Sequence, residues 1–155
     1  MARATEPQYP RISAWLTSQL AAKGWKRQNQ LADASGGRLN VKTISKWVNG
    51  NAEPETAMVV ILAEVFDRPI VEALDAAGHT ELAAYLAKDS GTRPDDPAIT
   101  EILSADLLTD EEKAAYIEMY RADVQAAEAV KAAAAQRVRQ LAQSVSDARR
   151  DHRIS

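Results

Sequence analysis

Cysteine is absent from this chain of 155 residues, and aromatic residues make up only 5% of it. Without cysteine the chain has neither a disulfide framework nor a thiolate metal site, which fits a cytoplasmic protein. The scarcity of aromatic rings disfavours a thick β-sandwich core. Alanine supplies many of the hydrophobic residues, which total 46%. This composition favours thin packing between helices.

Long hydrophobic runs and catalytic motifs are also missing. No segment approaches the roughly 18 apolar residues that span a membrane, and the N-terminal MARATEPQYP lacks the apolar core of a signal peptide. The two histidines, His79 and His152, lie far apart, and the chain contains no P-loop, dinucleotide fingerprint or nucleophile elbow. We therefore expect no enzyme, no metal or cofactor, no small-molecule ligand and no membrane partner.

The net charge of −3 conceals two oppositely charged segments. Residues 11–50 hold seven basic side chains and one acidic side chain, a net charge of +6. Residues 51–89 hold two basic and eight acidic side chains, a net charge of −6. Because the local field decides where a polyanion binds, the acidic total leaves nucleic acid as a possible partner of residues 11–50.

Residues 39–54, LNVKTISKWVNGNAEP, contain a short helix with two different faces. Ile44, Trp47 and Val48 recur at helical spacing and form an apolar stripe. The opposite face carries polar and basic side chains, namely Lys42, Ser45, Lys46 and Asn49. Asn40 is a favourable N-cap, and Asn49 with Gly50 can end the helix. The pattern predicts a helix over 41–48. Its apolar stripe would pack against the protein core, and its polar and basic face would be available to nucleic acid.

Apolar periodicity and turn residues predict further helices on both sides of this one. We expect helices over 12–23, 27–34, 54–66, 70–77 and 81–88, with Thr80 as the cap of the last. Lys26 and Arg27 precede the second helix, where a bound phosphate would offset their positive charge. A solvated basic turn is the alternative. Residues 1–10 are expected to be a flexible arm, 11–88 a helical domain and 89–98 a linker rich in proline and aspartate.

Residues 99–155 are expected to be a helical C-terminal region that serves oligomerisation. Thr109 and Glu112 form a capping box, and neither glycine nor proline occurs from there to Arg149. Side chains alternating by three and four define a heptad seam. The seam comprises Ile117, Tyr120, Val124, Ala127, Lys131, Ala134, Val138, Leu141, Val145 and Ala148. Self-association, packing against the first domain and binding of another protein all remain open.

Several residues at fixed spacing carry a family resemblance. They are Gln28, Leu31–Ala32, Gly36, Leu39, Thr43–Ile44–Ser45, Trp47, Asn49–Gly50, Pro54 and Leu62–Ala63. Over residues 11–78 the chain resembles the lambda-repressor-like helix-turn-helix family of phage repressors and short bacterial regulators (the Cro/C1 or XRE type). The turn after Gly36 is two residues longer than is usual there. The resemblance implies an all-α fold, with a DNA-binding domain of five to six helices, a linker and a long C-terminal helix.

The same resemblance implies roles for individual residues, and the helical wheel supports most of them. Candidates for reading bases in the major groove are Asn40, Val41, Lys42, Ser45, Lys46 and Asn49. Candidates for holding DNA phosphates are Lys23, Lys26, Arg27, Gln28, Arg38 and Thr43. The basic residues Arg137, Arg139, Arg149, Arg150 and Arg153 either touch DNA beside the site or solubilise the C-terminal helix.

These observations favour a sequence-specific transcriptional regulator that binds a double-stranded DNA operator. The resemblance points to a repressor of the phage-immunity type, with the C-terminal helix as a possible homodimer interface. The alternative is an antitoxin-like interaction protein, whose C-terminal helix would bind and neutralise a partner protein.

Overall fold

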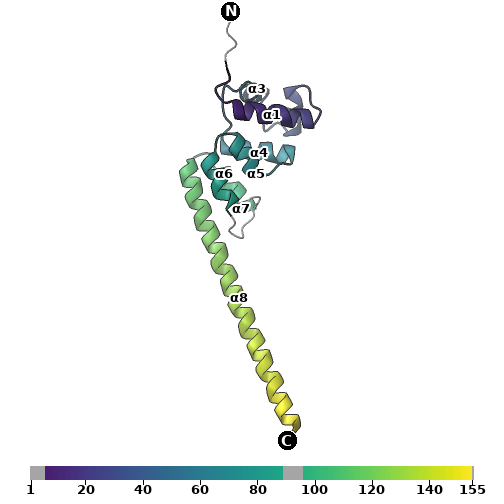
Figure 1. Cartoon of the computed structure of the whole chain (residues 1–155), viewed down its shortest axis with the longest axis vertical. Coiled ribbons are helices and arrows are strands. Elements are labelled where there is room, and N and C mark those ends of the chain that lie inside the picture. The colour runs from purple at the N-terminus through teal and green to yellow at the C-terminus, as the bar shows by residue number, and fades with distance from the viewer. Residues whose placement is uncertain (1–5, 89–95, 155) are drawn as a thin grey trace, which may run out of the picture. The chain divides into compact units, whose positions relative to one another are not determined.

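The computed structural model describes residues 6–88 and 96–154, and its regular elements are all helices. The all-α prediction is therefore confirmed. The chain divides into two compact units, residues 1–117 and residues 118–155. The helices, labelled in Figure 1, are α1 (Pro10–Ala22), α2 (Gln28–Ala34), α3 (Val41–Val48), α4 (Thr56–Phe66), α5 (Ile70–Ala76), α6 (Thr80–Ala87), α7 (Pro97–Leu103) and α8 (Asp110–Ile154).

The core of the first unit consists of the inward faces of its short helices. Both α1 and α2 pack against α3, α5 packs against α4 and α6, and α7 packs against α4. Each helix contributes at least one fully buried aliphatic side chain, as Leu16, Leu31, Ile44, Leu62 and Leu74 illustrate. Burying one such side chain stabilises a fold by about 1.5–3 kcal/mol. The predicted inward set of α4, which includes Val59 and Phe66, is confirmed.

Several helix ends differ from the prediction by one or two residues. Proline fits the first turn of a helix because it needs no N–H partner there, and α1 accordingly begins at Pro10 rather than at residue 12. The same preference predicts that α4 starts at Pro54, but the helix begins at Thr56. Thr80, the predicted cap of α6, is instead its first residue, and His79 occupies the N-cap position.

Helices begin inside the ranges expected for the arm and the linker: α1 begins at Pro10, and α7 begins at Pro97. Residues 1–5 and 89–95 lie outside the described residues, so the predictions for most of the arm and most of the linker stay predictions. Within the described part, the Tyr9 N–H donates to the Gly50 carbonyl at 2.9 Å, which ties this end of the expected arm to the domain. Asp96 caps α7 by accepting from the Ala98 N–H at 2.9 Å, so the helix begins at Pro97.

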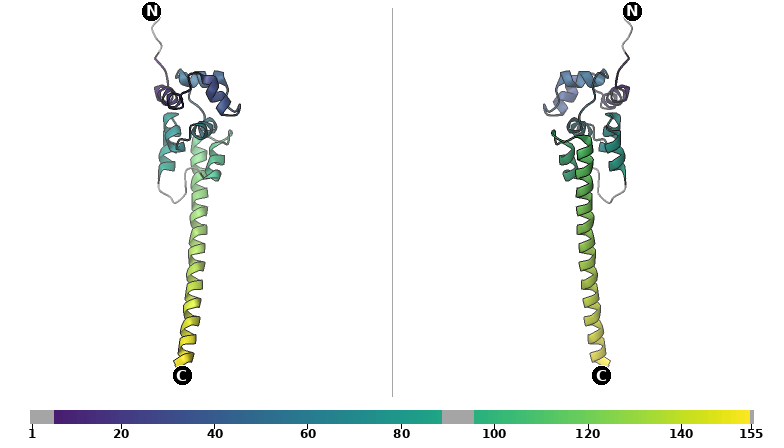
Figure 2. Two further views of the ribbon diagram at one scale, coloured as in Figure 1. Left: turned by 90° about the vertical axis from the view of Figure 1, so that its right-hand side faces the viewer. Right: turned by 90° about the vertical axis from the view of Figure 1, so that its left-hand side faces the viewer.

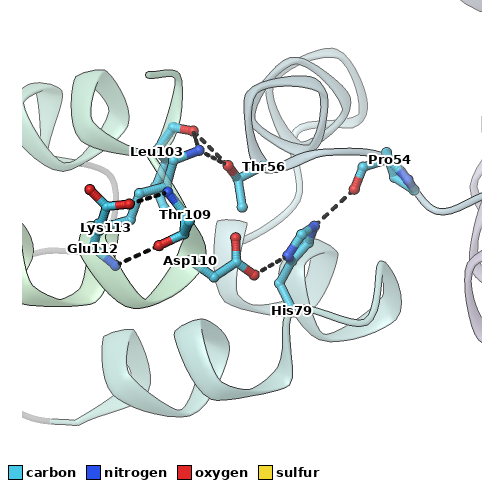
Figure 3. Close-up of polar contacts among 8 residues, drawn as sticks. All are labelled: Pro54, Thr56, His79, Leu103, Thr109, Asp110, Glu112 and Lys113. Atoms are coloured by element: carbon cyan, nitrogen blue, oxygen red, sulfur yellow. Dashed lines mark hydrogen bonds and ion pairs between the residues drawn. The ribbon is translucent and has the colours of Figure 1, made fainter. Parts of the chain in front are cut away.

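The first turns of α8 belong to the first unit, although the sequence pattern assigns them to the C-terminal region (Figure 3). The Lys113 ammonium is buried and donates to the Thr56 hydroxyl and to the Leu103 carbonyl, the latter at 2.9 Å. The Thr56 hydroxyl also donates to the Leu103 carbonyl at 2.8 Å. These bonds join the start of α4, the end of α7 and the first turn of α8.

A histidine bridges the same junction (Figure 3). His79 Nε2 lies 2.8 Å from the Pro54 carbonyl oxygen, and Nδ1 lies 2.5 Å from an Asp110 carboxylate oxygen. A carbonyl oxygen and a carboxylate oxygen therefore face the two ring nitrogens of His79. Ile117 closes the junction with a fully buried side chain. Its assignment to the oligomerisation seam is therefore corrected, because it lies within the core of the first unit.

The second unit is the remainder of α8, which runs without interruption to Ile154 (Figure 2). The predicted capping box is confirmed at the start of α8, within the first unit, with reciprocal bonds between Thr109 and Glu112 of 3.2 and 3.3 Å. Three large apolar side chains of the seam are exposed, Val138 at 65%, Leu141 at 67% and Val145 at 52%. Among the described helices, none combines the length and apolar character needed to cross a membrane.

Candidate nucleic-acid interface

The two faces of α3 differ in burial as their side chains predict. Ile44 is fully buried and Trp47 is 2% exposed, so the apolar stripe anchors the helix to the core. Lys42, Thr43 and Lys46 are exposed. The remaining base-reading candidates are spread around this face: Asn40, Val41 and Asn49 are exposed, and Ser45 is half-buried.

The start of α3 is fixed by its own cap. The Asn40 side-chain oxygen accepts a hydrogen bond from the Lys42 N–H at 2.8 Å, which confirms Asn40 as the N-cap. An N-cap of this kind stabilises a helix by about 1 kcal/mol. The oxygen of Asn40 is thereby occupied, so its side-chain NH₂ is the part that can reach a base.

The end of α3 is held by the segment that enters α1. The Ser13 hydroxyl donates to the Val48 carbonyl at 2.5 Å. Gly50, with φ of +72°, is buried beside Pro7 and Tyr9, and a Cβ at this position would collide with Pro7. The end of α3 is therefore fixed by contacts with α1 and with the segment before it, whereas its start is fixed by the Asn40 cap.

The long turn between α2 and α3 is organised by a buried serine. The Ser35 hydroxyl donates to the Ala32 carbonyl at 2.6 Å and accepts from the Leu39 N–H at 3.0 Å. Gly36 and Gly37 follow it with positive φ angles of +69° and +81°. Leu39 then returns to the core at 3% exposure. This arrangement accommodates the two additional residues and leaves the buried stripe of α3 in place.

The basic side chains of residues 11–50 fall into two groups. Arg11 pairs with Asp75 at 2.5 Å, and Arg38 pairs with Glu64 at 3.1 Å while also donating to the Ser35 carbonyl. The other five basic side chains have no carboxylate of the described residues within ion-pair distance. This second group comprises Lys23, Lys26, Arg27, Lys42 and Lys46, all of them exposed. Five uncompensated positive charges therefore surround the helix-turn-helix segment.

Four of the predicted phosphate-holding residues lie around the turn between α1 and α2. Lys23 follows α1, Lys26 and Arg27 precede α2, and Gln28 is the half-buried first residue of α2. The N-terminus of α2 is partly satisfied internally, because the Arg27 N–H donates to the Gln30 side chain at 3.0 Å. Lys23, Lys26 and Arg27 thus remain as exposed cations on either side of a short turn.

Sequence reasoning missed the residues that support the site. Ser13 lies one residue after the buried Ile12, and Ser35 lies beside two glycines, so neither has a periodic signal. Lys113 did have a periodic signal, because it precedes Ile117 by four residues and therefore lies on the same inward face of α8. No group of three or more His, Asp or Glu side chains in the described residues could hold a metal ion.

Residues 18–72 match the family model described as "Helix-turn-helix". The matched segment runs from the second half of α1 to the start of α5 and contains the whole of α2, α3 and α4. The chain matches no curated protein and no solved structure.

Proposed function

We propose that this chain, whose residues 18–72 belong to the Cro/C1-type helix-turn-helix family of DNA-binding transcription regulators, is a repressor of the phage-immunity type. The family binds double-stranded DNA. One observation carries the proposal that α3 reads the operator of this repressor. The exposed face of α3 presents Lys42 and Lys46 opposite the buried Ile44 and Trp47.

In the proposed complex, α3 lies in the major groove. Lys42 and Lys46 can donate to guanine O6 and N7, the side-chain amide of Asn49 can pair with adenine N6 and N7, and the Asn40 NH₂ can donate to a purine N7. Val41, 42% exposed, can contact a thymine methyl group. The Ser45 hydroxyl accepts from the Asn49 amide at 3.4 Å, which orients the two side chains together.

Phosphate contacts would fix the register of the domain without reading sequence. We assign these contacts to Lys23, Lys26, Arg27, Gln28 and Thr43. Arg38 joins them only if its ion pair with Glu64 opens, so we expect it to contribute less. Bound protein would exclude RNA polymerase by occupancy, and pairing of two copies through α8 would let two half-sites bind together.

The test is selection of bound sequences from a random DNA pool with the full chain, followed by a reporter whose promoter carries the selected site. Repression that depends on the site supports the proposal. Enrichment of no sequence rejects sequence-specific reading, and activation of the reporter rejects the repressor assignment.

The exposed Val138, Leu141 and Val145 also favour the second candidate function, an antitoxin-like protein whose C-terminal helix binds another protein. Co-purification of a small toxin with the full chain, lost in a variant with these three residues changed to serine, would support it. A stable homodimer without such a partner would count against it.

A further inference from the structure

An ion pair joins the turn before α3 to the acidic part of the chain. Arg38 lies in this turn, and its guanidinium Nη1 is 3.1 Å from a carboxylate oxygen of Glu64 on α4. The Nε of the same guanidinium donates to the Ser35 carbonyl at 2.8 Å. Ser35 is buried, and its hydroxyl organises the turn. Arg38 is therefore held on one side by the rigid turn and on the other side by a surface carboxylate.

The position of Arg38 brings its charge close to the proposed DNA-reading face. At most about 7 Å of backbone separates Arg38 from Asn40, the N-cap of α3, because a residue spans no more than about 3.6 Å. Lys42 follows in the first turn of α3 and is exposed. A polyanion that binds this face therefore comes near Glu64 as well as near Arg38.

The pair is accessible to solvent and can be exchanged. The side chain of Arg38 is 47% exposed and that of Glu64 is 65% exposed. Ion pairs this exposed are weak, because water competes for both partners. A phosphate oxygen accepts from a guanidinium as a carboxylate oxygen does. Arg38 can therefore leave Glu64 for a DNA phosphate while its Nε stays on the Ser35 carbonyl.

We propose that Glu64 is a specificity-determining residue, which withholds Arg38 from DNA until α3 is bound in the major groove of its operator. The inference rests on the proposed function, because it takes α3 as the reading helix. Exchange leaves the Glu64 carboxylate unpaired beside a polyanion, so it is unfavourable unless a phosphate is held against the guanidinium. Base contacts by α3 hold a phosphate there in the operator complex. In complexes with random DNA the pair stays closed.

The closed pair lowers the affinity for random DNA more than the affinity for the operator. Random DNA is bound through phosphate contacts, and each contact adds about 0.9 to the steepness with which log K falls against log salt. Arg38 adds no such contact while it is paired with Glu64. Because random sites greatly outnumber operators, weaker binding to random DNA increases the fraction of the protein that occupies the operator.

Salt titrations of the full chain on random and on selected DNA duplexes test the proposal. On random DNA, Glu64→Gln should steepen the slope by about 0.9, so its affinity advantage over the natural chain should grow about threefold between 200 and 50 mM salt. On the selected operator its slope should stay unchanged, because Arg38 already contacts a phosphate there. Glu81→Gln is the matched control, since it removes one exposed negative charge from α6 and should leave both slopes unchanged.

A variant at Arg38 gives the converse reading. Arg38→Gln removes the charge but keeps a nitrogen that can donate to the Ser35 carbonyl, so the turn retains its contact. This variant should reduce the slope by about 0.9 on the operator and leave the slope on random DNA unchanged. Combined with Glu64→Gln, it should cancel the steeper slope on random DNA. A partly unfolded variant would lose affinity by a similar factor at every salt concentration, so the slope distinguishes a lost contact from a lost fold.

Equal slopes for Glu64→Gln and Glu81→Gln on random DNA would overturn the proposal. A slope that Arg38→Gln reduces equally on random and selected DNA would also overturn it, because Arg38 would then contact phosphate in both complexes. An Arg38→Gln variant with the natural slope on both duplexes would show that Arg38 contacts no phosphate at all. Selection that enriches no sequence rejects the proposed function, whereas the slope of Glu64→Gln on random DNA still decides whether Glu64 withholds Arg38.

Discussion

The hydroxyl of Ser13 donates to the carbonyl oxygen of Val48 at 2.5 Å and so attaches α1 to the last turn of the proposed recognition helix. The carbonyl groups at a helix end have no partner within the helix, and a buried one without a partner lowers stability. A small side chain on α1 thus contributes to the position of α3.

Ser13→Ala removes this bond, and we expect the free energy of unfolding to fall by about 0.5–1.5 kcal/mol in urea titrations. Thr17→Ala is the matched control, because the Thr17 hydroxyl donates only to the Ser13 carbonyl within α1 and is exposed. Equal losses for the two variants would show that the bond to Val48 has no special role.

Gly50→Ala should destabilise the domain more than Gly36→Ala. Both glycines have a positive φ, +72° and +69°, which costs a residue with a side chain about 1–2 kcal/mol. A Cβ at Gly36 meets no atom within 4 Å, whereas a Cβ at Gly50 collides with Pro7. Thermal unfolding of the two variants compares them directly. Similar melting temperatures would mean that the packing of Pro7 and Tyr9 against the end of α3 is loose.

Acid should weaken the contact between α1 and α5. The hydrogen bond from Arg68 lowers the pKa of the Glu72 carboxyl below its ordinary value, with a further bond from Trp15 at 3.2 Å. Because the folded-state pKa is the lower one, this stabilisation is present above pH 4.5 and is lost as the pH falls below it. The pair is largely exposed to solvent, which screens it, so we expect its loss to lower the stability only slightly.

Glu72→Gln should therefore be less stable than the natural chain at pH 7 and nearly equal to it at the acid end of a denaturant titration series. The control is Glu81→Gln, which changes an exposed carboxylate on α6. A constant stability difference between Glu72→Gln and the natural chain at every pH would contradict the assignment.

A chain that ends at Ser104 should be much less stable than one that ends at Ala122. The shorter chain loses the buried Lys113 and Ile117 and the bond between His79 and Asp110. Leaving their partners exposed costs several kcal/mol by the usual values for a buried aliphatic side chain and for hydrogen bonds. Equal unfolding midpoints for the two chains would favour the boundary at residue 88 that the sequence pattern predicts.

The sequence was most informative where one pattern decides the structure. Ile44 and Trp47 define the buried face of α3, and Thr109 with Glu112 marks the start of α8, because periodicity and capping are local properties. The junction around His79 was not predictable in the same way. Its partners Pro54 and Asp110 are 25 and 31 residues away along the chain, and such contacts arise only from tertiary packing. The boundary of the first unit was misplaced for this reason.

Arg38 shows the same limit within the proposed site. Its charge and its position before α3 favoured a phosphate contact, but the fold brings Glu64 of α4 within 3.1 Å of it. Lys42 and Lys46 have no such neighbour among the described residues, so for them the sequence and the structure lead to the same proposal.

The most direct test of DNA reading by α3 is a footprinting titration of Lys42→Ala on the selected operator. The control is Lys88→Ala, which removes a lysine that follows the matched segment 18–72. We expect Lys42→Ala to weaken binding by about 1–3 kcal/mol and to relax base preference at one position of each half-site. Lys88→Ala should bind as the natural chain does. Unchanged affinity and unchanged base preference in Lys42→Ala would contradict the claim that this face of α3 reads DNA.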